Sequence, residues 1–425
     1  MKTMIRNVNV FDGVRERLAE RMDVVIEDNL VTDICRAGER PEGFGQVIDG
    51  GGRTAMPGMA DCHAHLGMSA PMDLLRTLRV DELAIRSTRF AREMLERGFT
   101  AVRDAGGVVY GLKACIDGGV VPGPRIFPSH ACISQTCGHA DMRASRAEER
   151  LAGGEHTSPL MRSGGMVLAD GVPEVMRAVR DQLFLGASQV KVMAGGGLSS
   201  PFDHLLTAQY TFEELKAAVD CAADYGTYVM AHIYTPGCMQ RAARAGVRSF
   251  EHATLMDEET ARIIQDKGIW VCPCPQFGSH VPRTGAGRPK ASGRQIPLED
   301  MIAAEERSTE LINRFGLRLL FGTDASDTPE YVEQRQHSDI SRYKRRFGSL
   351  ETLRSLTGSV RELGRLCTYQ HPYPDGKLGV LEPGAYADLL LVDGNPVEDA
   401  DILADKDRIV LVMKDGTVYK NRLAG

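Results

Sequence analysis

The sequence lacks the features that mark several broad classes of protein. Its 51 Lys and Arg residues are fewer than its 57 Asp and Glu residues, and the net charge is −6. Nucleic-acid-binding proteins carry a surplus of basic residues, so we expect no nucleic-acid partner. No apolar run reaches the roughly 18 residues that a membrane span needs, and the opening MKTMIRNVNV lacks the apolar segment of a secretory signal. We therefore expect a cytoplasmic protein with no membrane association.

Cysteine is present, but its spacing shows no pattern of paired disulfides. The ten cysteines are scattered along the chain, and a disulfide framework is not expected in a long chain without an export signal. Cys272 and Cys274 form the one closely spaced pair, and a Cys-x-Cys without a second pair is a weak zinc signal. We interpret both as small residues of the core.

Short strands of alternating polarity occur at both ends of the chain. They are read from MIRNVNVFDG and DVVIEDNLVTDI near the start and from ADLLLVDGNP and IVLVMKDGTVYK near the end. Asp-Gly and Asp-Asn between such runs are typical of hairpin turns. Because isolated hairpins need partners to bury their apolar faces, we expect residues 1–56 and 376–425 to form one small β-sandwich domain.

The middle of the chain, residues 57–375, alternates apolar strands with amphipathic helices such as 80–97 and 212–225. This alternation is typical of a parallel sheet with βα units. Eight strands are predicted, at 59–66, 99–105, 124–132, 188–194, 227–233, 248–253, 268–274 and 317–324. Eight is the number in a TIM barrel, so the predicted fold class is α/β, a (β/α)8 barrel with a small β-sandwich.

Two connections between these strands are unusually long. Residues 133–171 and 275–298 are rich in Gly, Ser, Arg and Pro. Long loops of this kind often line binding sites, so we expect both to form part of the pocket. The second loop carries four basic residues, Arg283, Arg288, Lys290 and Arg294. They are suited either to binding a carboxylate or to a solvated loop, and the sequence leaves both interpretations open.

Ionisable residues close several of the expected strands. They are His63, His65, Lys191, His232, His252 and Asp324. His63 and His65 are two residues apart, so their side chains share one face of a strand. Taken singly, each residue is explained as well by a structural hydrogen bond or a turn. Together they lie at the carboxyl ends of strands, where barrel enzymes place their active sites, and imidazole and carboxylate groups suit Zn²⁺ and its neighbours.

The segments that carry these residues resemble the amidohydrolase superfamily. The matching segments are PGMADCHAH, VKVMAGGG, MAHIY, FEHA and FGTDAS, in the family's order along essentially the whole chain. KVMAGGGLSSPFD, AQYTFEEL and AHIYTPG are more narrowly similar to one branch. That branch contains prolidase-like Xaa-Pro dipeptidases, arginine/lysine carboxypeptidases and ochratoxinase.

The resemblance implies a centre with two divalent metal ions, for which zinc is the expected metal. Lys191 would be carbamylated by CO₂ and would bridge the two ions. Carbamylation needs the neutral amine, which burial and nearby cations favour. His63 and His65 would hold one ion together with Asp324. His232 and His252 would hold the other.

The resemblance also implies the reaction and the substrate contacts. A metal-bridging hydroxide would attack an amide bond of a dipeptide or N-acyl amino acid with a free C-terminal carboxylate. Asp324 would act as the catalytic acid and base that moves the proton to the leaving amine. Tyr234 and His139 would contact this small-molecule substrate. The glycine-rich surround of the second contact in the family is here partly replaced by Thr136 and Cys137.

Other functions are compatible with parts of this pattern. One alternative is hydrolysis of a cyclic amide, a urea or a carbamate, and another is deamination. The relatives that act on cyclic amides or deaminate typically lack the lysine of the fourth strand, so Lys191 argues against them, whereas a urea or carbamate hydrolase would keep it. A metal-free scaffold would be expected to have lost ligands, and here all six positions are filled. A homo-oligomer is the common default for such enzymes.

Overall fold

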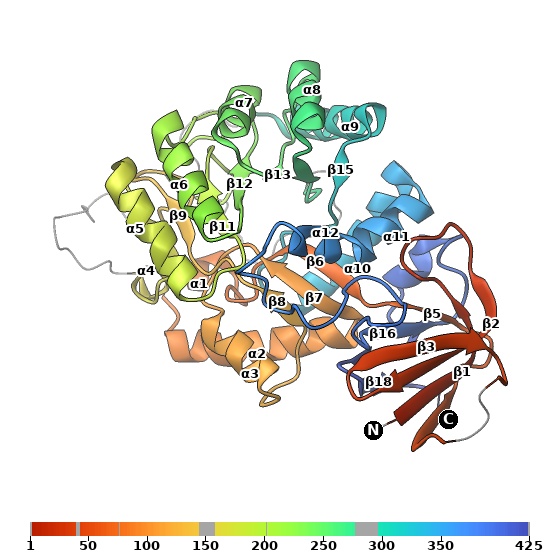
Figure 1. The fold of residues 1–425 in the computed structure, drawn as a ribbon. Helices are drawn as coiled ribbons and strands as arrows, with labels where there is room; N and C mark the ends of the chain where they lie inside the picture. The colour runs from red at the N-terminus through yellow and green to blue at the C-terminus, as the bar shows by residue number, and fades with distance from the viewer. Residues whose placement is uncertain are drawn as a thin grey trace.

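Strands from both ends of the chain pair in one mixed sheet of eight strands, at the lower right of Figure 1. The computed structural model describes residues 2–39, 43–75, 77–143, 158–200, 202–276 and 296–423. The strands of this sheet are β1 (Lys2–Val10), β2 (Ala19–Glu27), β3 (Leu30–Arg36), β4 (Gln46–Asp49), β5 (Thr54–Pro57), β16 (Leu389–Val392), β17 (Ile409–Lys414) and β18 (Thr417–Asn421). β5 pairs antiparallel with β16, so backbone hydrogen bonds hold the two ends together. The sandwich and the boundaries 1–56 and 376–425 stay predictions.

The sequence explains the turn at the end of this sheet. β17 and β18 pair antiparallel and are joined by Asp415 and Gly416. Both residues have positive φ, at 51° and 69°. Tight hairpins favour an Asp-Gly pair because their turn needs positive φ at both central positions.

The middle of the chain forms two parallel sheets with helices around them, which confirms the α/β class. The first sheet contains β6 (Met59–Ala64), β7 (Phe99–Asp104) and β8 (Arg125–Phe127). The second runs in the order β10 (Met166–Leu168), β9 (Cys132–Ser134), β11 (Val190–Met193), β12 (Val229–Ile233), β13 (Ser249–His252), β14 (Trp270–Cys272) and β15 (Arg318–Leu319).

Hydrogen bonds join the three-stranded sheet to the seven-stranded sheet at both edges of the smaller one, at β6 and after β8. After β15, the Cys62 amide donates to Phe321 and the Asp324 amide donates to His63, both at 2.8 Å. At the other edge the Ser188 amide donates to Pro128 at 2.8 Å. These contacts are consistent with a TIM barrel, and closure of the barrel stays a prediction because the strand ladders form two separate sheets.

The helices follow the strands as the βα pattern requires. They are α1 (Met72–Leu75), α2 (Val80–Glu96), α3 (Tyr110–Asp117), α4 (Pro159–Arg162), α5 (Gly171–Phe184), α6 (Phe212–Asp224), α7 (Pro236–Ala245), α8 (Glu258–Lys267), α9 (Leu298–Phe315), α10 (Pro329–Phe347), α11 (Ser349–Thr357), α12 (Ser359–Gly364) and the 3₁₀ turn η1 (Ala400–Ala404). The expected helices 80–97 and 212–225 correspond to α2 and α6. Within the described part of the chain, no helix is long and apolar enough to cross a membrane.

The expected third strand, 124–132, is wrong as a single element. Its first part is β8, in the three-stranded sheet, and its last residue begins β9, in the seven-stranded sheet. Pro128 has no amide hydrogen to continue a ladder, and His130 has a φ of 57°, which turns the chain. The expected last strand, 317–324, is also shorter, since only β15 pairs regularly with β14.

The two long connections are only partly irregular. Residues 133–171 include α4 and β10, so the expectation of one continuous loop is wrong there. Residues 144–157 lie outside the described residues, as do 277–295, which contain the four basic residues of the second loop.

Candidate active site

All six predicted metal ligands line one pocket, together with both predicted substrate contacts. His63 belongs to β6, Lys191 to β11, His232 to β12 and His252 to β13, and Asp324 follows β15. Parallel strands of this kind are buried on both faces, so these polar side chains are enclosed by the fold. The pocket has an empty volume of about 580 Å³, including its part open to solvent.

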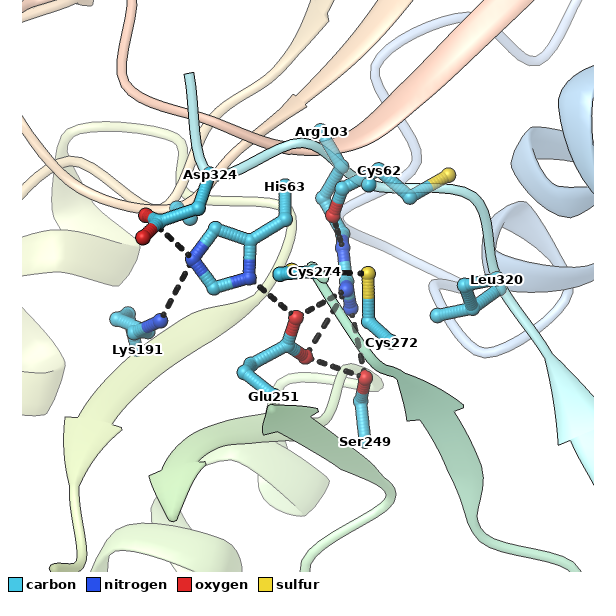
Figure 2. A network of polar contacts seen from close by, with 12 residues as sticks. Cys62, His63, Arg103, Lys191, Ser249, Glu251, Cys272, Cys274, Leu320 and Asp324 are labelled. Atoms are coloured by element: carbon cyan, nitrogen blue, oxygen red, sulfur yellow. Dashed lines mark hydrogen bonds and ion pairs between the residues drawn. The ribbon is translucent and has the colours of Figure 1, made fainter. Parts of the chain in front are cut away.

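His63 lies at the centre of a polar network shown in Figure 2. Its Nδ1 lies 2.6 Å from Oε2 of Glu251, which precedes His252 in β13. Glu251 in turn accepts two hydrogen bonds of 2.9 Å from the guanidinium of Arg103 in β7. The carboxylate therefore fixes the proton of His63 on Nδ1 and leaves Nε2 with a lone pair directed at the pocket.

His65 and Asp324 face each other through two atoms that can donate electron pairs to a metal, Nε2 of the imidazole and Oδ1 of the carboxylate. Nδ1 of His65 lies 2.9 Å from the carbonyl oxygen of Gly106, which can only accept, so this nitrogen carries the ring proton. In the neutral ring Nε2 then presents its lone pair to Oδ1 of Asp324, at 3.2 Å. Nε2 of His63 lies 3.6 Å from the same oxygen. Lone pairs at such distances repel unless a cation or a proton lies between them, so this arrangement fits a metal ion.

His232 and His252 provide a second pair of imidazoles, with ring centroids 4.6 Å apart. Nε2 of His232 lies 3.2 Å from the carbonyl oxygen of Gly196, so the proton is on Nε2 and Nδ1 keeps a lone pair. Nδ1 of His252 is buried and has no hydrogen-bond partner among the described residues. A buried polar atom without a partner calls for an explanation such as a bound ion.

Lys191 is buried between these groups, with 1% of its surface exposed. Its Nζ lies 3.4 Å from Nε2 of His63, and Figure 2 shows it on the side of that ring facing Asp324. No carboxylate of the described chain forms an ion pair with it within 4 Å. Its amine therefore lies among the candidate ligands that line the pocket.

The pKa values of the imidazoles fit a role as metal ligands. Burial lowers the pKa of His63 to about 4, with a contribution from the charge of Lys191. Burial also lowers the pKa of His232 and of His252 well below the ordinary value. For Asp324 burial raises the pKa, but the close contact with His65 and the other imidazoles outweighs burial and holds the pKa well below its usual value. These rings are therefore neutral and the carboxylate is ionised, as metal binding requires.

Two of the candidate ligands adopt strained backbone conformations. The φ of His252 is 73° and that of Asp324 is 55°. Left-handed conformations of residues other than glycine cost of order 1–3 kcal/mol and occur preferentially at functional sites. Both turns occur where a strand ends, and they direct the side chains into the pocket.

The two predicted substrate contacts lie against the second pair of imidazoles. The ring of His139 stacks on His232 at a centroid distance of 4.0 Å, and the ring of Tyr234 stacks on His252 at 4.9 Å. Nδ1 of His139 lies 2.8 Å from Oγ of Ser200. A Cβ atom on Gly197 would lie 1.9 Å from the ring of His139, so only a glycine at this position leaves room for the ring.

The sequence did not single out several residues that shape the site. Arg103 and Glu251 hold His63, Asp61 accepts hydrogen bonds from the amides of His63 and Thr323, and Gln276 donates to Asp324. A signal was available for one of them, because a glutamate directly before a histidine in a buried strand needs a partner of opposite charge. Gln276 follows β14 and had no comparable signal.

Cys272 and Cys274 lie behind this network, with their sulfur atoms 3.6 Å apart. They approach Glu251 and His63 closely enough to form a possible metal-binding group. Glu251 is already neutralised by Arg103, however, and burial raises the pKa of the Cys274 thiol to about 11. Both cysteines belong to a hydrophobic cluster, which agrees with the interpretation as core residues.

Comparisons with known proteins agree with this geometry. The model of the Amidohydrolase family matches residues 54–419. Ochratoxinase from Aspergillus niger is 29% identical over 408 residues, covering 93% of this chain and 82% of the relative. The crystal structure of a prolidase complexed with N-methylphosphonate-L-proline is 36% identical, with a TM-score of 0.87 and coverage of 99% of this chain and 100% of that chain. A Xaa-Pro dipeptidase with bound methionine in its active site is 28% identical, with a TM-score of 0.81 and coverage of 99% and 100%.

These relatives confirm the resemblance to the superfamily and to its branch with ochratoxinase and prolidase-like dipeptidases. The matched residues include every segment that carries a candidate ligand. The chain belongs to the amidohydrolase family.

Proposed function

We propose that the chain is a binuclear metal hydrolase that cleaves the amide bond of a dipeptide or N-acyl amino acid with a free C-terminal carboxylate. Family membership, with ochratoxinase and prolidase-like relatives, supports metal-dependent amide hydrolysis in general. The observation that carries the proposal is the convergence of the Nε2 atoms of His63 and His65 on one carboxylate oxygen of Asp324.

The donor atoms divide into two groups. His63 and His65 with Asp324 would hold one ion, since their donor atoms all lie within 4.8 Å of one another. His232 and His252 would hold the other. Such ions act as Lewis acids on a carbonyl oxygen and lower the pKa of water. Zinc is the expected metal, although imidazole and carboxylate ligands also accept Mn, Co and Ni.

Lys191 would connect the two groups as a carbamate. Its side chain is buried beside the imidazole of His63, and the carbamate would form from the neutral amine and CO₂. The carbamate would be an anionic ligand with two oxygen atoms, and would offset part of the positive charge of two divalent ions. A buried lysine at this position also argues against a deaminase or a cyclic amide hydrolase with one metal.

Asp324 would transfer the proton. Its Oδ1 faces the imidazoles and its Oδ2 accepts a hydrogen bond from Gln276. The side chain is partly exposed to the pocket, with 14% of its surface accessible. It would take a proton from the attacking water and deliver it to the nitrogen of the leaving amine.

Tyr234 and His139 would hold the substrate. Both line the pocket beside His232 and His252. The ligands of two relatives, an N-phosphonylated proline and methionine, each contain an amino acid carboxylate, which supports a substrate of this class.

The test combines metal analysis with a substrate screen. We expect two metal ions per chain and release of the C-terminal amino acid from dipeptides or N-acyl amino acids. A content near one ion per chain, with activity only on cyclic or amino-heterocyclic substrates, would overturn the proposal. Activity on ureas or carbamates alone would be consistent with the proposed metal centre but would contradict the proposed substrate class.

The carbamate is tested by Lys191→Ala. We expect the loss of at least one metal ion per chain and of nearly all turnover. The matched control is Lys414→Ala, because Lys414 is a similarly buried lysine, 4% exposed, in the mixed sheet. That variant should keep both ions. Normal turnover in Lys191→Ala would contradict the carbamate.

A further inference from the structure

One wall of the pocket is built from methionines of separate segments. Met68 follows β6, Met72 lies in α1, Met142 follows β9, Met166 lies in β10 and Met193 lies in β11. The chain has 18 methionines, and more than a quarter of them meet at this one pocket. Because all five side chains are thioethers, this wall of the pocket is apolar; we call it the methionine wall.

The methionine wall is supported from behind by a hydrophobic cluster. Met68, Met142, Met166 and Met193 are 3–5% exposed and belong to this cluster, and Met72 packs against it. The cluster also contains four leucines, Leu75, Leu83, Leu160 and Leu168. A thioether is only a weak hydrogen-bond acceptor and donates nothing, so the wall has little to offer a charged or strongly polar group.

The polar residues that line the pocket lie outside this cluster, although Lys191 shares β11 with Met193. Tyr234 and Leu198 belong to a different hydrophobic cluster, which also contains Leu205 and Met301. The candidate ligands His63 and Lys191 line the same pocket as the methionine wall. A substrate at the candidate metal centre would therefore contact both polar groups and the methionine wall.

We propose that the methionine wall binds an apolar side chain of the substrate. The enzyme would then prefer substrates with a large aliphatic, thioether or aromatic side chain at one of the two positions that flank the scissile amide. This inference rests on the proposed function for the identity of the reaction, but not for the binding of the apolar group. Because methionine is unbranched and polarizable, it adapts to irregular shapes, so discrimination among apolar side chains would be weak.

The first test measures binding without catalysis. Straight-chain carboxylates from butanoate to octanoate are titrated calorimetrically into the metal-loaded protein. We expect affinity to rise roughly fourfold for each methylene that becomes buried. In Met166→Ser the rise should be clearly smaller. An affinity that does not depend on chain length in the wild-type protein would overturn the inference.

The matched control is Met161→Ser. Met161 and Met166 are each 4% exposed and belong to the same hydrophobic cluster, but only Met166 is among the residues that line the pocket. Both variants should lose similar stability, whereas only Met166→Ser should lose the dependence on chain length. An equal loss in both variants would show a general effect of core disruption and would contradict the inference.

The second test uses turnover of two dipeptide series, Xaa-Ala and Ala-Xaa, with Xaa as Ala, Ser, Asp, Lys, Leu, Met or Phe. In one series kcat/KM for Leu, Met and Phe should exceed that for Ser and Asp at least about tenfold, and Met166→Ser should reduce this ratio. Equal kcat/KM values in both series would overturn the methionine wall but keep the proposed function. Binding that depends on chain length, without hydrolysis of any dipeptide, would support the methionine wall and contradict the proposed function.

Discussion

Glu251 orients the candidate metal ligand His63. It is fully buried, lies 2.6 Å from Nδ1 of His63 and is neutralised by Arg103. The charge of Arg103 and the bond with His63 hold the pKa of this carboxyl far below its usual value, against the effect of burial. A permanently ionised carboxylate behind an imidazole fixes its tautomer and raises its basicity.

Glu251→Gln should therefore weaken metal binding without touching a ligand. We expect a 10- to 100-fold loss of metal affinity, measured by competition with a chelator. The free energy of unfolding should fall by about 3–5 kcal/mol, because Arg103 is left as an uncompensated buried charge. The control is Ser249→Ala, which removes a hydroxyl that donates to the same carboxylate and accepts from Arg103, and which keeps both charges. Unchanged metal affinity in Glu251→Gln would show that the carboxylate does not orient His63.

His130 makes part of the stability dependent on pH. It is 3% exposed, its Nε2 lies 3.1 Å from the Leu185 carbonyl oxygen, and burial lowers its pKa to about 4. In the unfolded chain its pKa is about 6.5. Between these values the unfolded state binds more protons, so stability rises with pH and is lost as pH falls.

The variant His130→Asn isolates this effect, since asparagine tolerates the positive φ of 57° at this position. As the pH falls from 6.5 to 4, the wild-type protein should lose about 3 kcal/mol more of its free energy of unfolding than the variant. Urea unfolding at a series of pH values measures the difference. Parallel stability curves for the two proteins would refute the assignment.

The segment after β11 shows how an element positions a substrate contact. Gly197 lies against the ring of His139, and a Cβ atom there would approach the ring to 1.9 Å. In Gly197→Ala the ring must rotate off His232. A side chain can move at small cost, so we expect little change in unfolding temperature but a KM for carboxylate-bearing substrates raised about tenfold or more, as expected for a lost charge-assisted contact.

The same segment offers the control for this prediction. Gly195 has its nearest neighbouring atoms at 3.7 Å or more from an added Cβ, so Gly195→Ala meets only ordinary contacts. That variant should keep the wild-type KM, and both variants should keep their metal content. An equal rise of KM in the two variants would point to the segment as a whole rather than to His139.

At the scale of elements, the sequence predicted what depends on local patterns. α2 and α6 were expected within one residue of their bounds because their apolar spacing is a local pattern. The third strand was wrong because the sheet to which a short strand belongs depends on partners distant in sequence. In the sequence, the break between β8 and β9 at Pro128 and His130 shows only as two residues that interrupt the apolar run of the expected strand.

The candidate ligands were recognised because each lies in or after a strand of the parallel sheets and belongs to a sequence segment that resembles the family. Glu251 and Arg103 were missed because they are 148 positions apart, and a single sequence does not show that they pair. The methionine wall was missed for a similar reason, since its members come from separate segments and each resembles an ordinary core residue.

At the scale of the whole molecule, a buried ion pair connects the parallel strands to the mixed sheet. Nε of Arg125 in β8 donates to Asp388, next to β16, at 2.6 Å. The same guanidinium contacts Asp415 and lies 3.8 Å from the centre of the Tyr386 ring. None of these residues lines the active-site pocket, so we expect this connection to support stability and not chemistry.

A double-mutant cycle tests this separation. Asp388→Asn should lower the free energy of unfolding by about 3 kcal/mol, because it leaves a buried guanidinium with Asp415 as its only carboxylate partner among the described residues. Adding Arg125→Met should cost less in that background than alone, since the unpaired charge is removed with it. Metal content should stay at the wild-type value in all three variants. Additive effects would show that the pair is not coupled, and a loss of metal would mean that the mixed sheet shapes the site as well as stabilising the fold.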